Sequence, residues 1–318
     1  MYDLIIIGGG PAGITAGIYG ARQRLNTLLI TKDFGGQVAR KAVSIENYPG
    51  FEEISGQQLI QRFEKHLRRQ KIDIERDEAM QLKKLNNHFI VFTGNKNKFE
   101  SKTVIIASGA DPRPLEIPGE KEFLGRGLSY CCVCDGPLFP DKTAAVIGGG
   151  NTGFEAAIFL SKIAKKIYIL ETGPEVKANK ENQERVKETG KIEIITNAFP
   201  KEIRGEQFVN SLIYEDRKTG KTITLLLEGI FVEIGSQPAT SFTRAIAKGG
   251  DEQSSATAKG LVDFNERDEI KVEFETYQTK TPGLFAAGDV NVGKFKQIIT
   301  AAGEGAKAAL AAYDYLEK

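Results

Sequence analysis

The chain has 318 residues with 43 basic and 42 acidic side chains, so its formal charge is +1. At about 150 residues per domain this length predicts two domains, and the balanced charge argues against nucleic-acid or polybasic membrane binding. Two histidines and three cysteines argue against a histidine-rich metal site, Ser-His-Asp chemistry or a disulfide framework spread over the chain.

The N-terminus reads as a buried strand and not as a targeting segment. Leu4–Ile7 runs directly into glycines, without a preceding charged region or long apolar core. No apolar run approaches the roughly 18 residues of a membrane helix. We therefore expect a reduced, cytoplasmic location, where clustered cysteines are more often catalytic or metal-binding than structural.

A strand, a glycine turn and a helix start occur twice. Residues 4–13, with G-G-G-P-A-G, are echoed by residues 144–153, with G-G-G-N-T-G. A helical stretch and a second apolar strand follow each copy, at 14–22 and 27–30 in the first and at 154–164 and 167–170 in the second. In a G-x-G-x-x-G turn the glycines permit a tight turn, the close approach of a pyrophosphate and close packing of helix against strand. The N-terminus of the helix binds the negatively charged pyrophosphate. Two copies in this context predict two dinucleotide sites.

A second repeat has a different offset. The apolar segment 104–109, followed by Pro112, matches 230–235, followed by Pro238. Alternating strands and helices predict α/β folds with parallel sheets. The 34 glycines exceed the roughly 22 expected from average usage, and we assign the surplus to turns that contact nucleotides.

The dinucleotide fingerprint also calls for an acid about 20 residues after the turn, which binds a ribose hydroxyl. Glu171 fits this position after Gly153. Thr31, at the same spacing after Gly13, is not acidic, although Asp33 lies nearby. The second turn therefore carries the complete NAD-type pattern and the first does not.

The remaining segments are a loop and a C-terminal pattern. Residues 243–258 are polar and predict a surface loop. Residues 284–289 read as a strand that runs into a turn, and residues 297–316 as one Ala-rich helix.

All three cysteines lie between the two glycine turns. Cys131 and Cys134 form a C-x-x-C pair, which can open and close a small disulfide ring. Asp135 follows directly and is suited to move a proton to or from a leaving thiolate. Half of a zinc site and a buried inert cluster are the alternatives; Cys132 is interpreted as a bystander, with an over-oxidation liability or an alternative partner as further readings. Two dinucleotide sites and a dithiol predict FAD, NAD(P)H and electron relay.

Over essentially its whole length, the chain resembles the low-molecular-weight thioredoxin reductases. The redox motif of that family appears as S-Y-C-C-V-C-D-G at residues 129–136. Further matches to its flavin site are Gly35-Gly36-Gln37, E-N-Y-P-G at 46–50, Gly288-Asp289 and Lys296-Gln297-Ile298.

This resemblance implies an architecture and a set of roles. Cys134 is expected beside the isoalloxazine, and Cys131 is expected to attack the partner's disulfide. The implied fold is two Rossmann-like nucleotide-binding domains, the second inserted into the first. Residues 1–115 and 245–318 would form a discontinuous FAD-binding domain around an NAD(P)H-binding domain of residues 116–244 that carries the dithiol. The resemblance also implies a homodimer whose domains swivel.

The predicted catalytic residues are Cys131, Cys134 and Asp135, and no metal ligand is predicted. The residues predicted to bind the cofactors are Gly8, Gly10, Pro11, Ala12, Gly13, Thr31, Gly35, Gly36, Gln37, Asn47, Ala107, Gly109, Gly148, Gly150, Asn151, Thr152, Gly153, Glu171, Gly235, Gly288, Asp289, Lys296, Gln297 and Ile298.

Finer details are similar to the reductase part of the bacterial alkyl hydroperoxide reductase flavoprotein. The matching segments are 134–139, 175–178, 296–299 and 303–308. That flavoprotein has an additional N-terminal dithiol domain, which we expect this chain to lack because it begins at the first strand. A separate thioredoxin-like or glutaredoxin-like protein would then accept the electrons.

Departures from the family affect the cofactor. NADPH-using members carry H-R-R-x-x-x-R after the second strand, whereas residues 171–177 read E-T-G-P-E-V-K. A carboxylate at Glu171 would repel a 2′-phosphate and favour a free hydroxyl, so we predict NADH over NADPH. Lys296 replaces the arginine usual near the flavin, and Cys132-Val133 replaces commoner small residues.

Together these features predict a thioredoxin-disulfide reductase. Electrons would pass from NAD(P)H, with NADH favoured, through FAD and the Cys131–Cys134 dithiol to the disulfide of a small thioredoxin-like or glutaredoxin-like protein, with no nucleic-acid or membrane partner. The alternatives are an NADH-dependent reductase that feeds a peroxiredoxin system, a flavin dithiol oxidase that does not use NAD(P)H, and a non-catalytic redox sensor.

Overall fold

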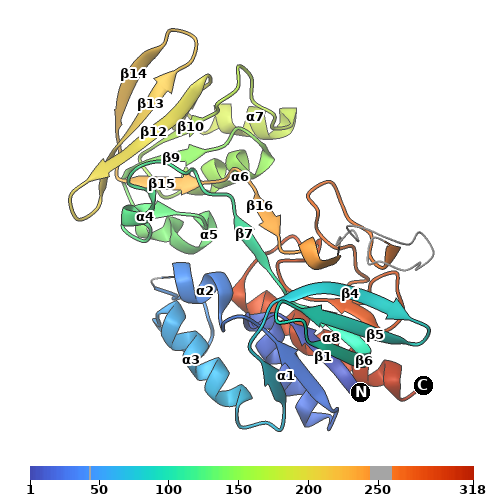
Figure 1. Ribbon diagram of the computed structural model, residues 1–318. Coiled ribbons are helices and arrows are strands. Elements are labelled where there is room, and N and C mark those ends of the chain that lie inside the picture. The colour runs from blue at the N-terminus through green and yellow to red at the C-terminus, as the bar shows by residue number, and fades with distance from the viewer. Residues whose placement is uncertain (43, 244–259) are drawn as a thin grey trace. The chain divides into compact units, whose positions relative to one another are not determined.

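The computed structural model describes residues 1–42, 44–243 and 260–318 (Figure 1). The chain divides into a discontinuous unit, Met1–Asp111 with Gln237–Lys318, and an inserted unit, Pro112–Ser236. It leaves the first unit through β7 (Ala110–Pro112) and returns through β16 (Ser236–Pro238), and these two strands pair with each other. Of the loop predicted at 243–258, only Thr243 lies within the described residues.

The discontinuous unit is built on a seven-stranded sheet in the order β3-β2-β1-β6-β5-β4, with β17 also paired to β6. Its parallel strands are β1 (Tyr2–Ile7), β2 (Thr27–Ile30), β3 (Asp73–Glu75), β6 (Lys98–Ile106) and β17 (Leu284–Ala286). An antiparallel extension is formed by β4 (Ala79–Leu85) and β5 (His88–Thr93).

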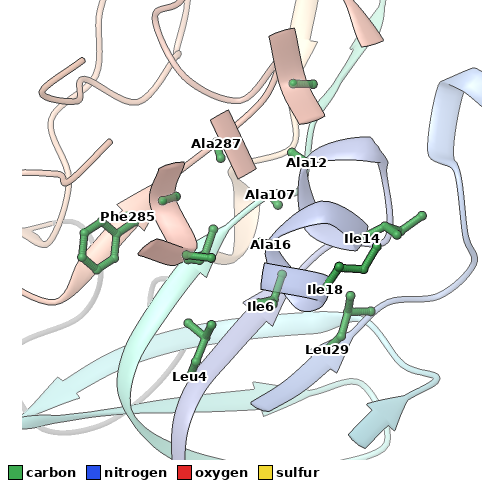
Figure 2. Close-up of a cluster of buried hydrophobic side chains, with 14 of the residues drawn as sticks. Leu4, Ile6, Ala12, Ile14, Ala16, Ile18, Leu29, Ala107, Phe285 and Ala287 are labelled. Atoms are coloured by element: carbon green, nitrogen blue, oxygen red, sulfur yellow. The ribbon is translucent and has the colours of Figure 1, made fainter. Parts of the chain in front are cut away.

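Alternation along β1 explains the apolar run Leu4–Ile7. Leu4 and Ile6 face one buried cluster, while Ile5 and Ile7 face another on the opposite side of the sheet. Both faces of a parallel sheet are covered, so its strands need apolar side chains in both directions. Figure 2 shows the first of these clusters, in which α1 (Pro11–Arg22) packs over the sheet.

The helices of this unit pack closely because small residues lie between them. The long α8 (Ile298–Leu316) contacts α1, and a Cβ at Gly305 would lie only 2.0 Å from the carbonyl oxygen of Ala12. The other helices are α2 (Gly36–Lys41) and α3 (Gly56–Leu67). In the described part of the chain, no helix combines the length and apolar character needed to cross a bilayer.

The inserted unit repeats the parallel plan with a five-stranded sheet in the order β11-β10-β9-β15-β8. These strands are β8 (Leu128–Ser129), β9 (Thr143–Ile147), β10 (Lys166–Leu170), β11 (Ile192–Ile195) and β15 (Gly229–Val232). A separate antiparallel sheet contains β12 (Ala198–Gly205), β13 (Val209–Asp216) and β14 (Lys221–Leu226). The helices are α4 (Glu120–Phe123), α5 (Cys132–Asp135), α6 (Asn151–Leu160) and α7 (Lys180–Glu188).

The predicted fold class is confirmed, because each unit joins a parallel sheet to a glycine turn and a helix. The helix predicted at 154–164 is wrong at its end. It stops at Leu160, after which the chain tightens into a turn with a hydrogen bond from the Ile163 N–H to the Leu160 carbonyl. The helix predicted at 297–316 is α8.

Candidate redox and dinucleotide sites

The first glycine turn, after β1, leaves the N-terminus of α1 open. Gly8 has φ = +117°, and a Cβ there would lie 2.2 Å from the Ala107 carbonyl oxygen. A Cβ at Gly13 would lie 1.8 Å from the Gly8 carbonyl oxygen. Gly10 is the N-cap of α1, carries no side-chain cap, and would place a Cβ in open space. Free helix N–H groups beside such space fit a pyrophosphate.

The second turn, after β9, has nearly the same geometry. Gly148 has φ = +128°, and a Cβ there would lie 2.5 Å from the Glu233 carbonyl oxygen. A Cβ at Gly153 would lie 2.0 Å from the Gly148 carbonyl oxygen, whereas one at Gly150, the N-cap of α6, would meet nothing within 4 Å. This turn also fits a dinucleotide.

The residues after the second strands differ in chemistry. Glu171 follows β10, and its carboxylate accepts the N–H groups of Gly149 and Gly173, each at 2.8 Å. Thr31 follows β2 and donates its hydroxyl to the Asp33 carbonyl oxygen at 2.5 Å. The carboxylate of Glu171 is therefore fixed beside the second glycine turn, which is the position that suits a ribose hydroxyl.

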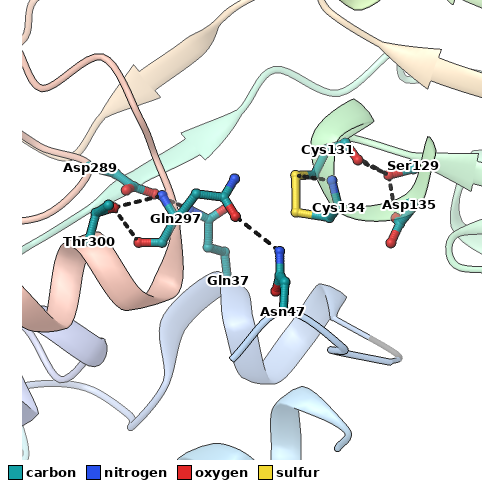
Figure 3. Close-up of a disulfide and its surroundings, with 9 residues drawn as sticks. All are labelled: Gln37, Asn47, Ser129, Cys131, Cys134, Asp135, Asp289, Gln297 and Thr300. Atoms are coloured by element: carbon teal, nitrogen blue, oxygen red, sulfur yellow. Dashed lines mark hydrogen bonds between the residues drawn. A yellow bond between two sulfur atoms is a disulfide. The ribbon is translucent and has the colours of Figure 1, made fainter. Parts of the chain in front are cut away.

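Four other predicted flavin-site residues form two pairs within the discontinuous unit (Figure 3). Gln37 donates its side-chain amide to Asp289 at 2.7 Å, and Asn47 donates its amide to the Gln297 side-chain oxygen at 3.3 Å. Gln297 also caps α8 together with Thr300. Burial raises the pKa of Asp289 to about 6, against the opposing charge of Lys296.

Lys296 forms hydrogen bonds and an ion pair within the protein. Its ammonium donates to the carbonyl oxygens of Asp289, at 3.1 Å, and Asn291, and it lies 3.2 Å from the Glu269 carboxylate. Glu304 on α8 accepts the Gly288 N–H at 2.7 Å and the Asn291 side-chain amide at 2.6 Å. Sequence reasoning missed Glu269 and Glu304 because no local spacing links them to the Gly288 turn.

In the inserted unit, Cys131 and Cys134 are joined by a disulfide, with their Cα atoms 5.2 Å apart. Cys131 is the N-cap of α5, and its sulfur accepts the Cys134 N–H at 3.2 Å. Ser129 accepts the Cys131 N–H at 2.9 Å and donates its hydroxyl to Asp135 (Figure 3). The predicted proton donor is therefore linked to the disulfide turn through one hydroxyl.

Cys132 lies apart from this chemistry. Its side chain is buried, and its sulfur lies 3.5 Å from the Ala156 carbonyl oxygen. Burial, with smaller contributions from Glu233 and Asp135, raises the pKa of this thiol well above its usual range. A protonated, buried thiol is a poor nucleophile, which favours the bystander interpretation.

Sequence reasoning missed two further acids of the inserted unit. Glu120, almost fully buried, accepts the N–H groups of Leu115 at 2.6 Å and Glu116 at 2.8 Å, and also the hydroxyl of Tyr130. Glu233 follows β15, and burial raises the pKa of its carboxyl to about 7. For Glu233 a signal existed, since the second sequence repeat aligns it with Ala107.

Two dinucleotide turns and a disulfide in one chain are the features of an oxidoreductase that moves electrons between a nicotinamide cofactor and a disulfide. The family profile described as "Pyridine nucleotide-disulphide oxidoreductase" matches residues 2–305, and the chain belongs to this family.

Individual relatives agree with the resemblance found in the motifs, which is confirmed. The chain is 42% identical over 316 residues to a subunit of alkyl hydroperoxide reductase in Staphylococcus aureus, covering 99% of this chain and 59% of that protein. It is 40% identical over 315 residues to "NADH dehydrogenase" of Bacillus subtilis, covering 99% of this chain and 58% of that one. It thus spans under two thirds of these curated relatives.

Two solved structures match over nearly their whole length. Thioredoxin reductase from Streptococcus pyogenes aligns with a TM-score of 0.89 at 34% identity, covering 100% of this chain and 98% of the other. Thioredoxin reductase from Giardia duodenalis aligns with a TM-score of 0.90 at 31% identity, covering 100% and 99%.

Proposed function

We propose that this chain is an FAD-dependent reductase that carries electrons from NADH through Cys131 and Cys134 to the disulfide of a thioredoxin-like or glutaredoxin-like protein. The main support for this proposal is that the Cys131–Cys134 disulfide lies in the same unit as a dinucleotide turn flanked by Glu171. The net reaction is NADH + H⁺ + partner disulfide → NAD⁺ + partner dithiol.

We assign the two cofactors to the two units. The discontinuous unit would hold FAD at the Gly8–Gly13 turn and near the Gln37–Asp289 pair, and the inserted unit would hold NADH at the Gly148–Gly153 turn. FAD, when bound, accepts an electron pair from NADH and passes it to a disulfide. The open N-caps of α1 and α6 support this assignment.

The cysteines exchange electrons by two displacements. The Cys131 thiolate attacks one sulfur of the partner disulfide, and the other partner sulfur leaves and takes up a proton. The Cys134 thiolate then attacks the Cys131 sulfur, which re-forms the internal disulfide and releases the second partner thiol. Asp135, held by Ser129 next to the Cys131 amide, is the proposed proton donor.

The preference for NADH follows from charge. Glu171 is fixed by two backbone N–H groups beside the second turn. Its carboxylate would accept hydrogen bonds from a free ribose hydroxyl and repel a 2′-phosphate.

A second candidate function is supply of electrons to alkyl hydroperoxide reduction. It is favoured by the 42% identity to a relative that is named as part of an alkyl hydroperoxide reductase. The accepting disulfide would then belong to a peroxiredoxin system, either directly or through a dithiol domain on the same or another chain.

Assembly and location stay predictions. We expect a homodimer and a cytoplasmic protein. Sedimentation velocity of the FAD-loaded protein measures the oligomeric state, because a monomer and a dimer differ twofold in mass.

The deciding test compares Cys134→Ser with Cys132→Ser in FAD-loaded protein. Under anaerobic conditions NADH should bleach the flavin of wild type and of both variants. Only Cys134→Ser should lose reduction of thioredoxin-like and glutaredoxin-like partners, because it cannot re-form the disulfide. Partner reduction by Cys134→Ser would contradict the mechanism. Absence of bleaching by NADH would favour a dithiol oxidase, and redox-dependent complex formation without turnover would favour a sensor.

A further inference from the structure

The residue immediately before Cys131 is hydrogen-bonded to a buried carboxylate. Tyr130 lies between β8 and α5 and donates its phenolic hydroxyl to Glu120, whose exposed fraction is 7%. Burial, together with the hydrogen bond and charge of Glu120, raises the pKa of Tyr130 well above its usual range, so the phenol keeps its proton and remains a donor. A hydrogen bond to an ionised acceptor is stronger than one between neutral groups. The chain is therefore anchored one residue before Cys131.

Glu120 is itself held in place, which allows it to act as an anchor. Its carboxylate also accepts the N–H groups of Leu115 at 2.6 Å and Glu116 at 2.8 Å. The backbone before it packs tightly against β12, because a Cβ at Gly119 would lie 2.1 Å from the Ile203 carbonyl oxygen. The Ile203 N–H donates at 3.0 Å to the carbonyl oxygen of the residue before Gly119. The hydroxyl of the tyrosine thus meets an acceptor that the framework of the inserted unit fixes.

A second contact holds the backbone of Cys131 itself. The hydroxyl of Ser129, a buried residue at the end of β8, accepts the Cys131 N–H at 2.9 Å (Figure 3). With Tyr130 bound to Glu120, hydrogen bonds restrain both residues on either side of the peptide bond that leads into Cys131. The Cα atom of Cys131 lies 5.2 Å from that of Cys134 in the closed disulfide.

We propose that Glu120 is a positioning residue that holds Cys131, through the Tyr130 hydroxyl, in place for disulfide closure and thereby makes the dithiol a stronger reductant. This inference deepens the proposed function and rests on it, because Cys131 belongs to the redox pair of that function.

The physical basis is conformational entropy. The closed disulfide ring and the anchor restrict the same stretch of backbone, so each costs less entropy when the other is in place. Without the anchor, the dithiol has more freedom to lose on closure, and closure becomes less favourable. The disulfide is then easier to reduce, and the dithiol is a weaker reductant.

The test measures the closure equilibrium in the absence of NADH and of any partner. FAD-loaded protein is equilibrated anaerobically with mixtures of reduced and oxidised dithiothreitol. The reaction is protein disulfide + reduced dithiothreitol → protein dithiol + oxidised dithiothreitol, which moves two electrons and two protons. Samples are quenched with acid and alkylated, and mass spectrometry measures the labelled fraction of Cys131 and Cys134.

Tyr130→Phe is the decisive variant, because it removes only the hydroxyl and leaves both backbone contacts of Glu120 intact. Tyr214→Phe is the matched control. Tyr214 is a buried residue of β13 in the apolar cluster against which Tyr130 packs, and it lies outside the cysteine segment. In a further variant, Glu120→Gln is combined with Tyr130→Phe.

We expect Tyr130→Phe to weaken disulfide closure about tenfold, which raises the midpoint potential of the dithiol by about 30 mV. Tyr214→Phe should match wild type, and the double variant should shift no further than the larger of the two single shifts, because Glu120 acts through Tyr130. A Tyr130→Phe equilibrium that superimposes on wild type overturns the proposal, even if urea unfolding shows a loss of stability. An equal shift in Tyr214→Phe also overturns it. Failure of NADH-driven partner reduction would refute the proposed function and leave this equilibrium measurable.

Discussion

The two glycine turns have almost the same backbone and different side chains around it. In both, a Cβ on the last glycine would lie within about 2 Å of the carbonyl oxygen of the first, at 1.8 Å for Gly13 and 2.0 Å for Gly153. The next strand is followed by Thr31 in one unit and by Glu171 in the other. Glycines therefore form the turn in both units, whereas the side chains that follow the neighbouring strands select what the turn binds.

The largest expected effect concerns the glycine turn that both units share. Gly153→Ala forces a methyl group against a backbone carbonyl that cannot yield, so we expect the free energy of unfolding to fall by about 3 kcal/mol or more. Urea unfolding of the wild type and the variant measures this difference.

Gly150→Ala is the matched control in the same turn. Its Cβ meets no protein atom within 4 Å, so we expect stability to change by less than about 1 kcal/mol. NADH binding should weaken, because the new methyl group occupies the space proposed for the pyrophosphate. Equal loss of stability in the two variants would refute the assignment of roles within the turn.

The next effect concerns the pH dependence of folding stability, to which each unit contributes one partly buried carboxyl group. Burial raises the pKa of Asp289 from 3.8 to about 6 in one unit and that of Glu233 from 4.5 to about 7 in the other. Each folded carboxyl binds its proton more tightly than the unfolded one, so stability is highest below the unfolded pKa and falls as pH rises through the folded one.

For Glu233 this loss should amount to about 2 kcal/mol between pH 4.5 and 7, allowing for partial solvent screening. Glu233→Gln should flatten that part of the curve and leave the part due to Asp289. Urea denaturation at a series of pH values measures it, and an unchanged slope in the variant would show that Glu233 does not carry a raised pKa.

A smaller effect concerns Glu171, which follows the second strand of the inserted unit. Glu171→Gln removes the charge that would repel a 2′-phosphate, so we expect the ratio of kcat/KM for NADH over NADPH to fall about tenfold, or about 1.4 kcal/mol. Glu175→Gln, in the same loop but exposed, should leave the ratio unchanged. A wild-type preference for NADPH would contradict the proposed role of Glu171.

The smallest effect concerns the first turn. Thr31→Val removes the hydrogen bond to the Asp33 carbonyl, and we expect a loss of about 1 kcal/mol in the free energy of unfolding. FAD affinity in Thr31→Val should change less than NADH affinity changes in Glu171→Gln, because the Thr31 hydroxyl donates to a protein carbonyl. Fluorescence titration with FAD tests this, and a large loss of FAD binding would assign Thr31 a direct role.

Much of the parallel framework was predictable, because each apolar strand is followed closely by a glycine turn and a helix. The antiparallel strands β4, β5 and β12–β14 were not predicted. Their burial alternates irregularly, and β14 is largely exposed, so hydrophobic periodicity gives little signal there. The C-x-x-C pair was visible as a motif, but its link to Asp135 through Ser129 appears only in the folded structure.

By itself, the sequence determined the two glycine turns, the dithiol spacing and the contrast between Thr31 and Glu171, since steric limits on φ and ψ act between residues close along the chain. Only the tertiary structure decided which distant side chains meet. Gln37 reaches Asp289 across 252 positions of sequence, and Asn47 reaches Gln297 across 250. Such contacts depend on the order and register of strands in a sheet, which no local pattern contains.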